Sequence, residues 1–240
     1  MKTLKPTPNL ADQVYDALLD EICGGALPAG SHLVQEQLAE RLGVSRQPVQ
    51  QAMARLKADG MVEEIGRRGL WVTPLDPKLM RHHYDIRAVL DGLATRLTAE
   101  RLRDGAEACA TFRRRSGEIL AQGIRAVETG NTAEQVRQDR ALHTLIYEMS
   151  GNPLLARTAE PHWRFLQRAM GEVLRRAKLP KEIWRQHAEI AEAIVVGDPD
   201  RAEHLMVEHD LDAATTLQAA LEANIEATEG LAAEGRRLRA

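Results

Sequence analysis

Four side chains in the second half of the sequence are of types that bind a divalent metal: Asp139, His143, His187 and His209. Asp139 and His143 are four residues apart, so a helix projects both from one face. His187 and His209 each lie among aliphatic residues at helical spacings, which turns them toward the interior of a helical domain. One carboxylate and three imidazoles on inward faces of three helices would form a site for zinc, or for nickel or another divalent ion.

These residues also have a simpler interpretation. A single histidine on an apolar face is more often a core residue with satisfied hydrogen bonds, and an Asp/His pair at this spacing is common by chance. Spacing alone does not show that the three helices converge. A metal held there with an open coordination position could also support hydrolysis, but no additional base stands at a recognisable spacing.

The segments that must position these residues are helical, because apolar residues recur in them at helical intervals. The predicted helices are 78–103, 105–129, 132–149, 153–178, 180–196 and 199–225. Each break between them combines a helix stop with a turn former or with a proline that starts the next helix. No strand is expected in this region, so the sequence predicts an all-helical bundle there.

The N-terminal third has a different pattern, in which short helices are followed by a hairpin. A helix at about 35–42 ends at Gly43, and Ser45 is placed to cap the helix that follows. Two helices joined by so short a turn are typical of a helix-turn-helix. Two short β runs, 61–65 and 70–73, flank a glycine-bounded loop, which predicts a wing beside the helices.

The second of these helices carries the residue types that read DNA. Side chains near its N-terminus would reach base edges in the major groove, where arginine pairs with guanine and glutamine with adenine. The wing arginines would contact phosphate or the minor groove. The predicted DNA contacts are Ser45, Arg46, Gln47, Gln50, Arg67 and Arg68. The alternative is that all six are solvated residues on an ordinary helical hairpin.

The composition fits a mainly helical chain of one large or two small domains. It has 240 residues, of which 44% are hydrophobic and only 3% aromatic, so aliphatic side chains must fill the core. Its net charge of −3 argues against indiscriminate nucleic-acid binding. No apolar run is long enough for a membrane span, and the N-terminus lacks a secretory pattern. With Cys23 and Cys109 expected as reduced thiols, a cytoplasmic location follows.

The domain boundary is expected at a short stiff segment in which Pro74 and Pro77 flank two residues. The predicted organisation is a winged helix-turn-helix at 8–74, a linker at 75–78, a helical effector-binding and dimerisation domain at 79–225, and a disordered tail at 226–240.

At residues 10–74 the sequence resembles the GntR-type winged helix. The resemblance lies in residues 25–33, 37–39, 42–49 and 67–72, and the Gly-Val-Ser-Arg-x-Pro-Val core at 43–49 is highly specific. One departure stands out. Relatives usually carry Arg-Glu-Ala where this chain has Gln50, Gln51 and Ala52. Because that arginine contacts DNA in the family, the resemblance implies that Gln50 changes the operator sequence that is read.

Residues from about 78 to 217 resemble the FCD effector domain of the FadR-type branch. The matching segments are 86–90, 139–143, 150–153, 187–198 and 202–209. The resemblance implies that Asp139, His143, His187 and His209 bind a divalent metal, with a small carboxylate or sugar acid beside it. Two local departures are Leu142, where relatives often have Phe, and Asp91-Gly92, where Glu-Pro is frequent. We expect neither departure to touch a ligand.

Arg87 lies on the same helical side as Leu90, Ala94 and Leu97. It could clamp a carboxylate bidentately or form a helix–helix salt bridge, and the resemblance favours the clamp. Asn152 and Arg164 are further candidates for the effector pocket, although Asn152 could instead cap the following helix.

The function that follows is an effector-responsive transcriptional regulator. A homodimer would place two recognition helices about one turn apart on a pseudo-palindromic DNA operator. Release of DNA on ligand binding, which makes the protein a repressor, is the commoner outcome in the family. The alternatives are a metal-dependent hydrolase and an architectural DNA binder that takes no effector.

Overall fold

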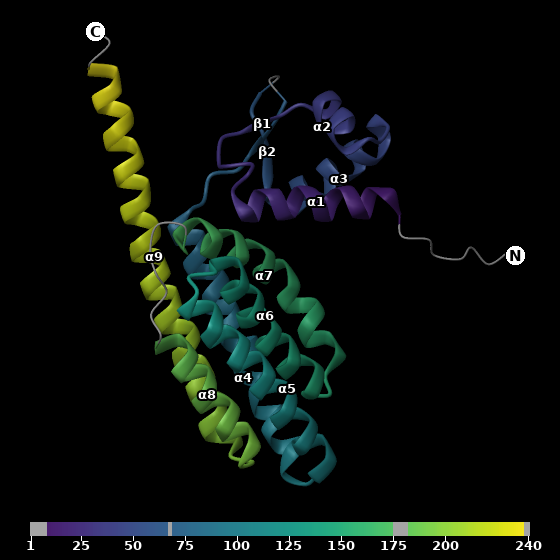
Figure 1. Cartoon of the computed structure of the whole chain (residues 1–240), viewed down its shortest axis with the longest axis vertical. Helices are drawn as coiled ribbons and strands as arrows, with labels where there is room; N and C mark the ends of the chain where they lie inside the picture. Colours follow the sequence, from purple (N-terminus) through teal and green to yellow (C-terminus); the bar gives the residue numbers. More distant parts are fainter. Residues whose placement is uncertain (1–8, 67–68, 175–181, 238–240) are drawn as a thin grey trace, which may run out of the picture. The chain divides into compact units, whose positions relative to one another are not determined.

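The computed structural model describes residues 9–66, 69–174 and 182–237. Within these residues the chain forms nine helices and three short strands (Figure 1). The contacts divide it into two compact units, residues 1–75 and 76–240. No helix in the described part of the chain is both long and apolar enough to cross a membrane.

The N-terminal unit combines three helices with a small sheet. Its elements are α1 (Leu10–Gly24), β1 (His32–Leu33), α2 (Gln35–Leu42), α3 (Arg46–Ala58), β2 (Val62–Glu64) and β3 (Leu70–Val72). The strands pair antiparallel in the order β1-β3-β2, with Leu33 opposite Leu70 and Val62 opposite Val72. This confirms the winged helix-turn-helix. Strand β1 was not expected, because two residues are too few to show an alternating pattern and its pairing with β3 creates it.

Local chemistry sets the turn between α2 and α3. Gly43 has a left-handed backbone with φ of 66°, and its N–H bonds the carbonyls of Ala39 and Glu40 at the end of α2. A side chain would be strained in that conformation, which is why glycine serves here. Ser45 then occupies the N-cap of α3 in extended conformation, but its hydroxyl makes no capping bond. The helix-turn-helix therefore leaves the Ser45 side chain available for other contacts.

The core of this unit lies between α1 and α3. Leu18 on α1 is fully buried, and so are Val49 and Leu56 on α3. These side chains recur at helical spacing, so burying them turns the opposite face of α3 toward solvent. The packing therefore decides which side of α3 is exposed.

The C-terminal unit is helical throughout its described residues. Its helices are α4 (Pro77–Arg103), α5 (Ala106–Glu128), α6 (Thr132–Met149), α7 (Pro153–Leu174), α8 (Glu182–Val195) and α9 (Pro199–Arg237). Several starts follow the expected chemistry: Asp76 caps α4 ahead of Pro77, and Asn131 caps α6. The all-helical prediction for this region is confirmed.

Helix α4 packs most extensively against α9. The two helices approach closely at Gly92, where an added Cβ would lie only 2.8 Å from Cγ2 of Val207. A larger residue at 92 would have to push α9 away. This close approach brings α9, including His209, against the face of α4 that carries Arg87 and Asp91.

Helix α9 corrects one expectation. It continues to Arg237, whereas a tail without regular structure was expected from residue 226. The glycines at 230 and 235 each cost about 1 kcal/mol of helix stability, but the segment is otherwise rich in Ala and Glu, which favour a helix. The predicted break between the helices at 153–178 and 180–196 falls within residues 175–181, which lie outside the described residues.

Candidate functional site

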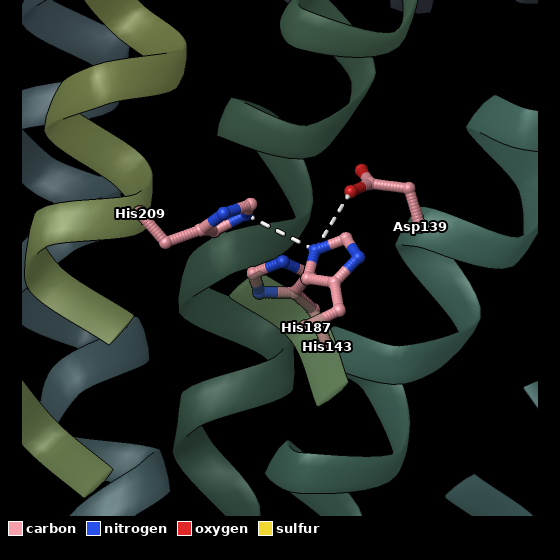
Figure 2. A group of neighbouring side chains, drawn as sticks. All are labelled: Asp139, His143, His187 and His209. Carbon is pink, nitrogen blue, oxygen red and sulfur yellow. Dashed lines mark hydrogen bonds and ion pairs between the residues drawn. The ribbon is translucent and has the colours of Figure 1, made fainter. Parts of the chain in front are cut away.

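The four predicted metal ligands come together in the C-terminal unit. Asp139 and His143 project from α6, His187 from α8 and His209 from α9 (Figure 2). Each offers one ligand atom, and these atoms all lie within 4.8 Å of one another. Nε2 of His187 is 3.3 Å from Oδ1 of Asp139 and 3.1 Å from Nε2 of His209. The packing of the bundle supplies the convergence that sequence spacing could not show.

These separations fit a metal. Ligand atoms about 2.0–2.2 Å from a tetrahedral zinc ion lie about 3.3–3.6 Å from one another, close to the two distances around His187 Nε2. A nitrogen and oxygen donor set of this kind suits zinc and other first-row divalent ions. The residues present therefore fit the ion that the sequence analysis expects.

The protonation states also suit metal binding. Burial and the charge of Arg87 lower the pKa of His143, and burial lowers the pKa of His209 well below its usual range. Burial alone would raise the pKa of Asp139, but the hydrogen bond from His187 and nearby positive charge outweigh it and lower that pKa. Neutral imidazoles and an ionised carboxylate are the forms that coordinate a cation.

Arg87 lies directly beside this cluster and is only 2% exposed. Its Nε and Nη2 donate to Oδ2 of Asp91 at 3.1 and 2.6 Å, and Nη2 lies 3.3 Å from Oδ1 of Asp210 on α9. The guanidinium also stacks over Trp163, 3.7 Å from the ring centroid. Burial would lower the pKa of Arg87, but the two carboxylates hold it well above its usual value. The contact with Asp210 is the helix–helix salt bridge that was the alternative to an effector clamp, whereas the pair with Asp91 lies within α4.

Asp91 is a site residue that the sequence analysis missed. It is 1% exposed, and its Oδ2 lies 3.0 Å from Nδ1 of His143. This departure from the family pattern therefore contacts His143, one of the predicted metal ligands. The four-residue spacing from Arg87 was the available signal, but nothing in the sequence placed His143 next to α4.

A small cavity of about 20 Å³ adjoins the cluster. Its lining residues include Tyr84, Arg87, Asp139, Trp184, His209 and Asp210. A volume of this size holds about one water molecule. Asp210 is fully buried and faces Arg87 from α9. A larger ligand needs side chains to move.

The other two effector candidates make local contacts. The side chain of Asn152 accepts from the N–H of Leu154 at the start of α7, which is the capping role weighed earlier. Arg164 donates to Glu160 on its own helix at 3.0 Å. Neither is among the residues that line the cavity.

The predicted DNA-reading residues lie on one exposed surface of α3. Ser45, Arg46, Gln47 and Gln50 are exposed, whereas Pro48 and Val49 between them are buried. Arg46 pairs with Glu36 of α2, and both side chains are about two-thirds exposed, at 68% and 70%. Gln50 lines a groove that also includes Leu70 of β3. Arg67 and Arg68 lie outside the described residues.

Both parts of the chain match known protein families. Residues 10–72 match the model described as bacterial regulatory proteins, gntR family, and residues 82–213 match the FCD domain. The second match alone covers more than half of the chain. The two matched regions fall within the two structural units.

Curated relatives extend over most of the chain. One relative is the Paenarthrobacter nicotinovorans protein named "Probable D-xylose utilization operon transcriptional repressor". The two chains are 29% identical over 83% of this chain and 85% of the relative. This chain is 24% identical to the HTH-type transcriptional repressor RspR of Escherichia coli, over 86% of its length and 88% of the relative.

Solved structures share the fold. The E. coli protein McbR/YncC aligns with 88% of this chain and 98% of its own, with a TM-score of 0.74 and 22% identity. A GntR transcriptional regulator from Rhodococcus sp. RHA1 aligns over the same fractions, with a TM-score of 0.74 and 18% identity.

Proposed function

The chain belongs to the GntR family of bacterial regulatory proteins with an FCD domain, and from this premise we propose that it is a metal-containing, effector-controlled repressor. The family and the relatives make it a DNA-binding transcription regulator and not an enzyme. The observation that carries the proposal is the convergence of Asp139, His143, His187 and His209 beside the buried Arg87. It acts in the cytoplasm, where its operator DNA is found.

DNA recognition is assigned to the exposed surface at the start of α3. Arg46 suits a bidentate contact with guanine, and Gln47 and Gln50 suit contacts with adenine. The pair that Arg46 makes with Glu36 is exposed, so exchanging Glu36 for a base or a phosphate costs little. Arg67 and Arg68 of the wing are proposed to contact phosphate or the minor groove.

The metal is proposed to be zinc or a similar divalent ion, held by Asp139, His143, His187 and His209. Bound there, it would supply a positive charge that attracts an anionic effector. The side chains of the protein bind and orient the carboxylate. Arg87 offers a planar pair of donors for a carboxylate, and the cation–π contact with Trp163 orients its guanidinium.

The effector is proposed to be a small carboxylate or sugar acid. The naming of one relative as a repressor of a D-xylose operon supports a sugar-derived ligand. Because the cavity holds about one water, the acid must displace Arg87 from Asp91 or Asp210, or move Trp184. Asn152 and Arg164 would take part only if α7 shifts as well.

A homodimer is proposed because α4 exposes an apolar stripe. Leu79, Ile86, Val89 and Leu93 recur at helical spacing and are 40–69% exposed. An exposed contiguous row of this kind marks an interaction surface, and an operator-binding regulator of this type uses two recognition helices. Pairing two copies through α4 would bury the row and match a pseudo-palindromic operator.

The proposal is tested by measuring operator binding with the zinc-loaded protein across a panel of organic acids. We expect tight, sequence-dependent binding and at least one acid that both weakens it and raises the unfolding temperature, because a ligand stabilises the state that it binds. Arg87→Lys should lose the acid effect while still binding DNA. An acid-insensitive protein that binds DNA tightly would instead be the architectural binder, and absence of any sequence preference would refute the regulator's proposed mechanism.

A further inference from the structure

We infer that Asp91 is a positioning residue for the metal centre, which orients the imidazole of His143 and ties it to Arg87. Nothing in the family matches or the ligand set assigns a role to this residue. The inference rests on the proposed metal site and adds to it a carboxylate that does not itself bind the ion.

The contact geometry carries this assignment. Oδ2 of Asp91 lies 3.0 Å from Nδ1 of His143, and both side chains are fully buried, with 0% and 1% of their area exposed. Nη2 of Arg87 lies 3.1 Å from the same Nδ1, but a guanidinium cannot accept a hydrogen bond, so a proton on Nδ1 is accepted by the carboxylate of Asp91. The lone pair of His143 is then on Nε2, which becomes the ligand atom.

Asp91 is itself held in place from several sides. Arg87 donates twice to Oδ2, and the hydroxyl of Tyr147 on α6 donates to Oδ1. Tyr147 in turn accepts from Nε1 of Trp163 on α7, at 3.2 Å. These contacts from α4, α6 and α7 fix the carboxylate, so it can fix the ring of His143.

The arrangement is that of a carboxylate, a histidine and a metal in series. Such partners set the tautomer and raise the basicity of the ligand nitrogen, and their loss typically weakens metal binding about 10–100-fold. Asp91 also neutralises Arg87, so one carboxylate serves both the metal ligand and the proposed effector clamp. Its removal should therefore change metal binding without removing any ligand.

The test is a zinc titration of the metal-free, full-length protein against a competing chromophoric chelator. We expect Asp91→Asn to weaken zinc binding about 10–100-fold, because the amide removes the negative charge facing Nδ1. Asp91→Glu restores a carboxylate and should recover most of the affinity. The matched control is Asp85→Asn, since Asp85 pairs with Arg81 at the same four-residue spacing on α4 but is exposed.

A spectroscopic measurement separates positioning from general damage. Co²⁺ in place of zinc gives visible absorption bands that depend on ligand geometry. Asp91→Asn should shift these bands, and Asp85→Asn should leave them unchanged. If Asp91→Asn does not fold, Tyr147→Phe removes only the hydroxyl that holds Asp91, and a weaker shift in the same direction is expected.

The outcomes distinguish this inference from the proposed function. If the wild-type protein binds no zinc, or His187→Ala binds it equally well, the proposed metal site fails and this inference fails with it. If the metal site holds but Asp91→Asn, or Tyr147→Phe in its place, matches the wild type in affinity and in Co²⁺ spectrum, the inference alone is overturned. A loss in Asp91→Asn that Asp91→Glu does not relieve would also overturn it.

Discussion

Gly123 on α5 lies so close to Trp184 on α8 that a Cβ at residue 123 would come within 2.0 Å of Cη2 of the indole. Trp184 is 3% exposed, packs edge-on against His187 with ring centroids 5.1 Å apart, and lines the cavity beside the metal ligands. A glycine on a neighbouring helix thus sets the position of one wall of the site.

Replacing Gly123 by alanine should therefore displace Trp184. The overlap is with a rigid ring, so we expect a loss of about 1–3 kcal/mol in the free energy of unfolding and a shift in tryptophan fluorescence. Gly117→Ala is the matched control on the same helix, because no other part of the described chain lies within 4 Å of its added Cβ. That control should be neutral or stabilise by up to about 1 kcal/mol. Equal effects of the two substitutions in denaturant titrations would contradict the account of Trp184.

Metal removal should lower the unfolding temperature. An ion present at 100 times its dissociation constant contributes about 2.7 kcal/mol, or roughly 5–10 °C for a chain of this size. A chelator should remove this gain from the wild type, and His187→Ala should not show it at all. His204→Ala is the control, since His204 is exposed and pairs with Glu208 on its own helix. A wild-type unfolding temperature that changes with neither zinc nor chelator would count against the metal site.

Arg46 should contribute to DNA binding and little to folding. Arg46→Ala is expected to weaken operator binding about 5–150-fold, corresponding to about 1–3 kcal/mol for a lost base contact. Its unfolding free energy should change by less than about 1 kcal/mol, because the pair with Glu36 is exposed. Gln50→Arg should change the preferred operator sequence instead of the overall affinity.

Fluorescence anisotropy with operator and scrambled duplexes measures both effects. Arg114→Ala, which removes an exposed arginine paired with Glu118 on α5, should bind both duplexes like the wild type. If Arg46→Ala retains full affinity and preference, the surface at the start of α3 is not the one that reads the operator.

His83 should make the helical unit less stable as the pH falls. Its ring stacks on Phe165, with centroids 4.2 Å apart, and its Nδ1 lies 3.0 Å from Nδ1 of His162. Burial first, and then the charges of His162 and His82, lower the pKa of His83 to about 4. Between pH of about 6.5 and 4 the unfolded chain therefore binds a proton that the folded chain does not, so stability decreases as the pH falls through that window.

The comparison that checks this is His83→Gln against His82→Gln, where His82 is the exposed neighbour. Melting temperatures measured from pH 7 to pH 4 should fall less steeply in His83→Gln than in the wild type. His82→Gln should stay close to the wild type, because the charge of His82 is the smallest of the three contributions to the lowered pKa of His83. Identical slopes for all three proteins would show that the histidine pair has no part in the pH dependence.

The sequence by itself determined the features that depend on short-range chemistry. The turn at Gly43, the helix starts at Asp76 and Asn131, and the shared face of Asp139 and His143 follow from backbone preferences and helical periodicity. The wing hairpin was also predictable, because its glycines and β-formers are adjacent in the chain. The short strand β1 was not, since it exists only through pairing with β3.

Only the tertiary structure decided how the site is assembled. The convergence of α6, α8 and α9 depends on packing between residues far apart in the chain, which no local pattern encodes. The same packing brings Asp91 against His143 and Asp210 against Arg87. A buried charge requires a partner in space, whatever its position in the sequence. For that reason the metal ligands could be predicted from residue types and spacing, whereas the carboxylate that orients one of them could be found only in the folded chain.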